Sequence, residues 1–171
     1  MSKDLLKFRL LPLLLIIVGL SLSSTVSANS NQVSKTESKL DYMNKFEQIM
    51  KPITTSYAVW GTDFMSLRYN KSKEKATLLN NARDLESEAK HLITRTTNLR
   101  PPNSLQSLHG KLTNLAASWH FAMQLWVAMV EDLKPENIGS PSATAKVGRN
   151  IQGLLKPKVE EVSKALEKLN N

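Results

Sequence analysis

The feature that most constrains this chain is the spacing of its apolar residues, which recur at alternating steps of three and four. This 3.5-residue repeat is the pattern of α-helices that pack along a left-handed seam. A half-buried β-strand would place apolar residues at every second position, and the segments with this repeat show no such alternation. The most regular segment contains Leu105, Leu108, Leu112, Leu115, Trp119, Ala122, Trp126, Met129 and Leu133.

Three further segments carry an apolar face that predicts a helix. The first contains Met43, Phe46, Met50, Ile53, Tyr57, Trp60, Phe64 and Leu67. The second contains Leu78, Ala82, Leu85, Ala89, Leu92, Thr96 and Leu99. The last is less regular and contains Ile151, Leu154, Leu155, Val159, Val162, Ala165, Leu166 and Leu169.

Proline and polar residues separate these four segments. The double proline at 101–102 cannot continue a helix, so the second helix must end before it. Asn103 and Gln106 have the spacing of a capping box at the start of the third helix. A polar stretch predicts a turn at 70–72, and one continuous helix with a stutter is the alternative. A loop is expected at 134–141.

Four amphipathic helices joined by short connections predict an all-α fold, an antiparallel up-down-up-down four-helix bundle. The bundle is expected to occupy residues 38–171 as one domain. A polar segment at 29–37 reads as a flexible lead-in.

Residues 1–28 are typical of a signal peptide. Lys3, Lys7 and Arg9 precede an apolar run of 13 residues at 10–22, which is shorter than the roughly 20 residues of a membrane span. Small and polar residues then lead to a cleavage site after Ala28. An uncleaved membrane anchor is the alternative interpretation.

The chain contains no cysteine, which excludes disulfides and thiolate metal sites. An exported domain without disulfides must be held together by packing alone. Small domains of eukaryotic secretory proteins are commonly stabilised by disulfides, so the absence of cysteine favours a bacterial periplasmic or extracellular location.

No residue pattern indicates catalysis or a cofactor. A single Glu-x-x-His motif joins Glu88 to His91, whereas di-iron bundles need this motif on two helices. The other two histidines, His109 and His120, lack a glutamate at that spacing. His91 and His120 are expected away from the helix seams, and His109 at the edge of the core. Since no phosphate loop, nucleophile elbow or serine triad appears either, we expect a non-enzymatic protein without metal or haem.

The formal net charge is +8 at pH 7. A positive surface attracts anionic polymers or membrane headgroups of a cell envelope. Nucleic acid is not an expected partner, because exposed basic and aromatic residues do not interleave on one surface.

Two prolines inside predicted helices, Pro52 and Pro157, should each kink its helix or end one piece of it. Their heights place both near the middle of the bundle on neighbouring helices. Ala89 is small and leaves room at this level. One hypothesis is an apolar mid-bundle pocket lined by Ile53, Tyr57, Leu85, Ala89, Leu115, Trp119, Leu155 and Val159. The alternative is that the bulky side chains of Trp119 and Tyr57 fill this space.

The leading functional hypothesis is an exported binding protein that accepts a small apolar ligand or a partner helix between its own helices. A structural or envelope-associated protein, which uses its basic surface on anionic polymers, is the alternative. A cofactor-holding bundle is a third and weaker hypothesis.

Export predicts that the processed protein begins at Asn29. N-terminal sequencing of the protein recovered outside the cytoplasm checks this expectation. An intact leader on that exported protein would contradict it.

Overall fold

The computed structural model describes residues 38–69, 74–134, 136 and 141–170. The predicted signal peptide, the lead-in and the turn at 70–72 lie outside these residues. The described part of the chain contains four α-helices and no strand, so the prediction of an all-helical fold with four helices is confirmed. They are α2 (Lys39–Tyr69), α3 (Lys75–Thr97), α4 (Gln106–Glu131) and α5 (Pro141–Asn170).

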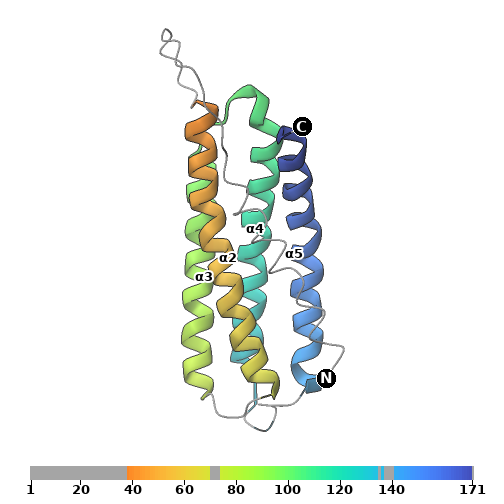
Figure 1. Cartoon of the computed structure of the whole chain (residues 1–171). Helices are drawn as coiled ribbons and strands as arrows, with labels where there is room; N and C mark the ends of the chain where they lie inside the picture. Colours follow the sequence, from red (N-terminus) through yellow and green to blue (C-terminus); the bar gives the residue numbers. More distant parts are fainter. Residues whose placement is uncertain (1–37, 70–73, 135, 137–140, 171) are drawn as a thin grey trace.

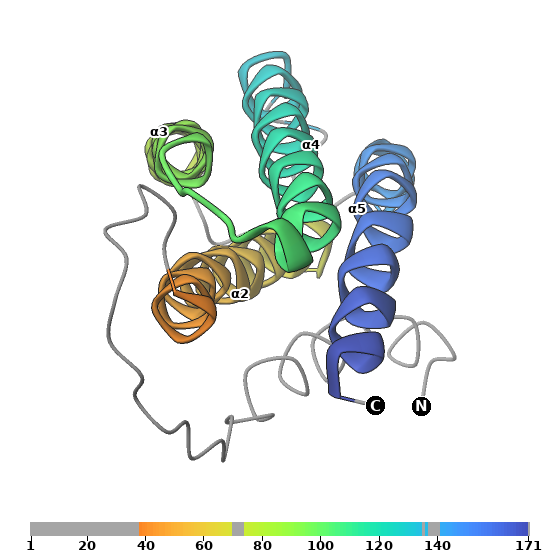
Figure 2. The same cartoon turned by 90° about the horizontal axis from the view of Figure 1, so that it is seen from above.

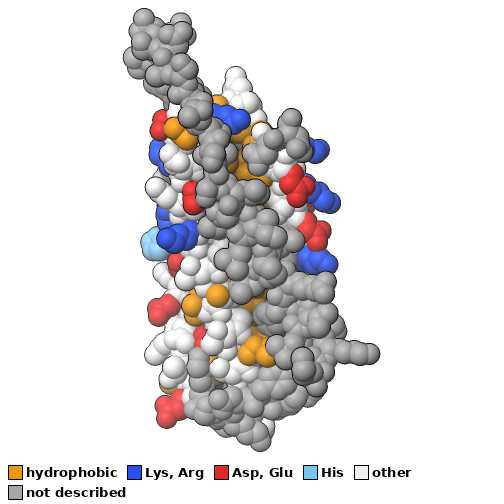
Figure 3. Space-filling model, viewed as in Figure 1, with side chains coloured by type: hydrophobic (Ala, Val, Ile, Leu, Met, Phe, Trp, Pro, Cys, Tyr) orange, Lys and Arg blue, Asp and Glu red, His pale blue; other side chains and the backbone are white. Residues whose placement is uncertain are grey.

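The four helices lie side by side and alternate in direction along the chain (Figure 1). Viewed from above, they surround a shared interior rather than forming one flat layer (Figure 2). α4 packs most closely on α3 and α5, while α2 contacts α3 and α5 and completes the ring. Charged side chains lie along both edges of the face shown in Figure 3.

Helix α2 begins at a hydrogen-bonded cap. The backbone N–H of Asp41 donates to Ser38 Oγ over 3.1 Å, and the Ser38 hydroxyl donates to Asp41 Oδ2 over 2.6 Å. This reciprocal pair satisfies one of the backbone donors that a helix start leaves without an intrahelical partner.

The capping box predicted at Asn103 and Gln106 is wrong. Asn103 opens a short 3₁₀ turn, η2 (Asn103–Leu105), and α4 begins after it without a side-chain cap. The Gln106 side chain instead donates to the carbonyl of Pro101 over 3.3 Å. Pro102, directly before η2, has an extended backbone. The chain then enters α4 through the tighter 3₁₀ turn.

The predicted apolar faces form the core. Every face residue predicted on α2 and α3 is buried, including Thr96, and on α4 only Met129 is half-buried. The three tryptophans are each at most 1% exposed. On the less regular α5, Leu154, Ala165 and Leu169 remain half-buried.

Neither internal proline ends its helix, because α2 runs through Pro52 and α5 runs through Pro157. Proline has no N–H, so Pro52 leaves the carbonyl of Gln48 without its intrahelical donor. The Arg95 guanidinium of α3 donates to that carbonyl over 3.1 Å. The neighbouring helix therefore supplies the hydrogen bond that Pro52 removes.

Three hydrogen bonds join α2 to α3, and we call them the polar ladder. Arg95 donates to the Gln48 carbonyl, the hydroxyl of Ser56 donates to Glu88, and the Asn81 amide donates to Asp63 over 3.0 Å. The three α3 residues are seven positions apart and share one face of that helix. Ser56 and Asp63 are both buried, so sliding α2 along α3 by one turn would cost them these partners. The ladder therefore specifies the register of the two helices.

Helix α5 approaches α2 closely at Gly148. A Cβ atom at this position would lie 2.4 Å from the Phe64 ring, which is itself stacked on Trp60. The ring cannot move aside without disturbing that stack. Gly148 therefore provides the space that Phe64 fills.

Gly148→Ala is expected to lower the free energy of unfolding by about 1–3 kcal/mol, because the new methyl group overpacks against Phe64. The matched control is Gly153→Ala in the same helix, where a Cβ atom meets nothing within 4 Å. This control should raise stability by up to about 1 kcal/mol through helix propensity. Denaturant unfolding measures both, and equal effects of the two changes would contradict the proposed contact.

Candidate ligand-binding site

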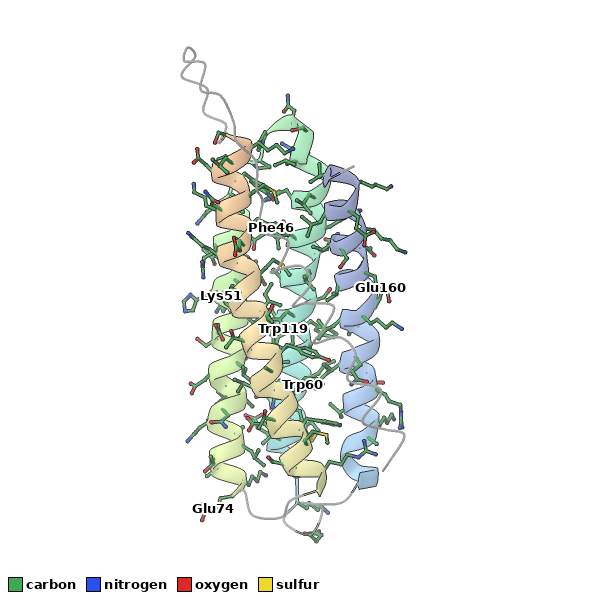
Figure 4. The ribbon with its side chains drawn as sticks, in the orientation of Figure 1. Phe46, Lys51, Trp60, Glu74, Trp119 and Glu160 are labelled. Carbon is green, nitrogen blue, oxygen red and sulfur yellow. The ribbon has the colours of Figure 1, made fainter. Side chains whose placement is uncertain are left out.

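Five aromatic side chains meet inside the molecule, and we call them the aromatic cluster. Tyr57, Trp60 and Phe64 lie on one face of α2 because they are three and four positions apart. Trp119 and Trp126 lie one heptad apart on α4 and face them. Figure 4 shows Trp60 and Trp119 at neighbouring levels of the interior.

The rings of the cluster form a continuous set of contacts. Trp60 stacks on Phe64 with centroids 5.5 Å apart and meets the edge of Trp126 at 6.2 Å. Tyr57 lies 5.3 Å from Trp60 and 6.0 Å from Trp119. These separations fall in the range in which each aromatic pair adds about 0.5–1.5 kcal/mol beyond its buried area.

Four polar atoms of the cluster are buried without a hydrogen-bond partner among the described residues. They are the Tyr57 hydroxyl and the indole nitrogens of Trp60, Trp119 and Trp126. An indole N–H can only donate a hydrogen bond, and each buried donor left unpaired costs about 1–3 kcal/mol. The cluster thus presents four unpaired donors, and of these groups only the Tyr57 hydroxyl can also accept a hydrogen bond.

Burial raises the pKa of the Tyr57 hydroxyl to about 12. An ordinary phenol is already neutral at physiological pH, and burial keeps the Tyr57 proton as a hydrogen-bond donor to a higher pH still. A phenol held in this state is a weak general base and a weak nucleophile.

The structure places all eight residues of the predicted mid-bundle pocket in the hydrophobic core, with exposed fractions of 5% or less. Tyr57 and Trp119 are in ring contact. The hydrogen bond from Ser56 to Glu88 brings the adjacent Ala89 to the level of Tyr57 on α3. A space for a ligand among these residues remains a prediction.

The predicted pocket lining omitted Trp60, Phe64 and Trp126, which lie in ring contact farther along α2 and α4. The same heptad spacing that identified Tyr57 and Trp119 also contains these three residues. The predicted lining took only residues at the height of Pro52 and Pro157, and this choice excluded the three aromatic residues. Continuing each aromatic seam by one or two turns would have included them.

The histidines lie apart from the aromatic cluster's ring contacts. His91 is exposed, and its motif partner Glu88 accepts the Ser56 hydroxyl. His109 Nδ1 is 3.3 Å from the Tyr42 hydroxyl, and His120 Nε2 is 3.6 Å from a Glu86 carboxylate oxygen. Among the described residues, no three histidine, aspartate or glutamate side chains gather in a group that could hold a metal ion.

A second concave feature, the α4–α5 groove, lies between the start of α4 and the end of α5. Its volume is about 380 Å³. Sequence reasoning did not predict it. It is lined by Ser104, Ser107, Leu108, Lys111, Glu161, Lys164, Ala165, Lys168 and Leu169.

Comparison of the chain with protein families, with curated proteins and with solved structures finds no match. In the described part of the chain, no helix combines the length and the apolar character needed to cross a membrane.

Proposed function

We propose that this chain is an exported, non-enzymatic binding protein that holds a small apolar molecule in its aromatic cluster. The bound molecule carries a hydrogen-bond acceptor such as a carbonyl or ether oxygen. The observation that carries this proposal is the set of four buried donors with no acceptor among the described residues.

The energetic argument compares the unpaired donors with the stability of an ordinary domain. Each unpaired donor costs about 1–3 kcal/mol, and a whole domain is stable by only about 5–15 kcal/mol. Four such costs are of the same order as that total. A ligand that accepts even one of these hydrogen bonds offsets part of the cost and stabilises the folded state.

The ligand class follows from the walls of the site. Aromatic rings and the surrounding aliphatic residues favour an apolar body, while the donors favour an oxygen on it. Tyr57 is held neutral, so the cluster offers no charge to pair with an ion. These features support binding rather than catalysis.

Export rests on residues 1–28, whose basic start, apolar run and small residues are those of a signal peptide. In this proposal the processed chain forms an up-down-up-down four-helix bundle in a bacterial periplasm or outside the cell. Packing alone stabilises it there, because the chain has no cysteine.

Two probes of similar size separate the apolar part from the acceptor part of the proposal. Cyclohexanone carries a carbonyl oxygen and methylcyclohexane does not. In ¹⁵N-labelled protein, cyclohexanone is expected to shift indole N–H resonances saturably. It should also bind about tenfold more tightly than the difference in hydrophobicity between the two probes predicts, which corresponds to one hydrogen bond of about 1.4 kcal/mol.

Tyr57→Phe removes only the hydroxyl and should reduce the preference for cyclohexanone. The control is Tyr42→Phe on the same helix, because the Tyr42 hydroxyl contacts His109 outside the cluster. This control should leave the preference unchanged.

Ala89→Leu tests whether the core has room for a ligand. With a space at this level, the larger side chain is tolerated and abolishes probe binding. In a filled core it costs about 1–3 kcal/mol. Such a loss of stability, together with no indole shift from either probe in the parent protein, would overturn the proposal.

A further inference from the structure

We propose that the α4–α5 groove binds the carboxylate form of a single-chain fatty acid, one molecule at a time. The site is distinct from the aromatic cluster. Leu108 in the groove is eleven residues from Trp119, or about 16 Å along α4.

The groove combines an apolar lining with a basic one. Leu108, Ala165 and Leu169 come from facing helices and supply aliphatic surface. Lys111, Lys164 and Lys168 also line it. Apolar surface beside ammonium groups matches a molecule with a hydrocarbon tail and an anionic head.

The lysines of the groove are available to an anionic ligand. Within the described residues, no carboxylate forms an ion pair with Lys111, Lys164 or Lys168. The groove's own carboxylate, Glu161, is 3.1 Å from the Nζ of Lys158 instead. The lining therefore attracts an anion.

The start of α4 adds a second attraction for a carboxylate. Its first turn carries no acidic residue, and Leu105 before it makes no side-chain capping hydrogen bond, although the Gln106 N–H donates to the Asn103 carbonyl within η2. The partial positive charge of a helix start favours anions there. Ser104 and Ser107 lie at this end of the groove and offer hydroxyl donors.

The shape of the groove favours a single molecule over a membrane surface. Its volume of about 380 Å³ lies within the range of about 300–1,000 Å³ typical of small-molecule sites. A protein that binds a bilayer presents a broad apolar surface to it, whereas this site is a hollow between two helices.

The direct test is titration of the protein that begins at Asn29 with decanoate. The decanoate concentration is kept below that at which decanoate forms micelles. We expect saturable binding, measured by isotope-edited NMR and by calorimetry. Decanol has a similar tail without the charge and should bind at least tenfold more weakly. Failure of decanoate to bind the parent protein would overturn the proposal.

The double change Lys164→Gln with Lys168→Gln should weaken decanoate binding by about tenfold or more. The matched control is Lys156→Gln, an exposed lysine on the same helix whose side chain reaches Glu160 rather than the groove. The control should change affinity less than twofold. An equal loss in both variants would show general charge attraction and would overturn the groove as the site.

Two further outcomes would contradict the proposal. The first concerns which site binds decanoate, and the second concerns whether the anion is a free fatty acid or a lipid of a bilayer. If decanoate shifts the indole resonances and not those of Leu108 and Ala165, it binds in the aromatic cluster and the groove proposal fails. If the protein binds phosphatidylglycerol vesicles but not free decanoate, the basic surface recognises a bilayer and the proposal also fails. Neither outcome depends on whether the aromatic cluster binds cyclohexanone.

Discussion

The packing of the aromatic face of α2 against α4 is the contact on which the rest of the structure depends. Tyr57 and Trp60 reach Trp119 and Trp126 across the interior. Rings of this size hold the surrounding helices apart. The small residue Gly148 restores contact on one side, where α5 closes over Phe64.

The apolar seams alone leave the register of α2 and α3 open, because a heptad pattern repeats every seven residues. The polar ladder removes this freedom through three hydrogen bonds that form together in only one alignment. The bond from Arg95 to the Gln48 carbonyl also makes Pro52 compatible with a continuous helix. A residue that usually breaks helices is thus tolerated through a contact from the neighbouring one.

Sequence spacing predicted most of the core, since the side chain of a helical residue lies on a face set by its position in the chain. The burial of Leu112, Ala82 and Val162 follows from this rule alone. The exceptions have physical reasons. Met129 is half-buried while the next residue, Val130, is buried, because a straight helix drifts by about 20° per heptad against a 3.5-residue repeat. The cap expected at Asn103 is replaced by a 3₁₀ turn after two prolines.

The features that bear on function were harder to predict because they arise between helices. The missing acceptors of the tryptophans depend on what every neighbouring side chain does. The α4–α5 groove depends on how closely two helix ends approach, and no spacing rule reports that distance. Sequence reasoning placed Tyr57 and Trp119 in the interior, where both are buried, but it did not anticipate the unpaired donors.

The central claim is that the buried donors of the aromatic cluster are satisfied by a bound molecule. Native mass spectrometry of the protein isolated folded from the organism that makes it tests this claim most directly. The account predicts a mass larger than the processed chain by that of one small molecule, which organic solvent releases and which contains an acceptor oxygen. The bare mass of the processed chain, in protein that was never unfolded, would contradict the account.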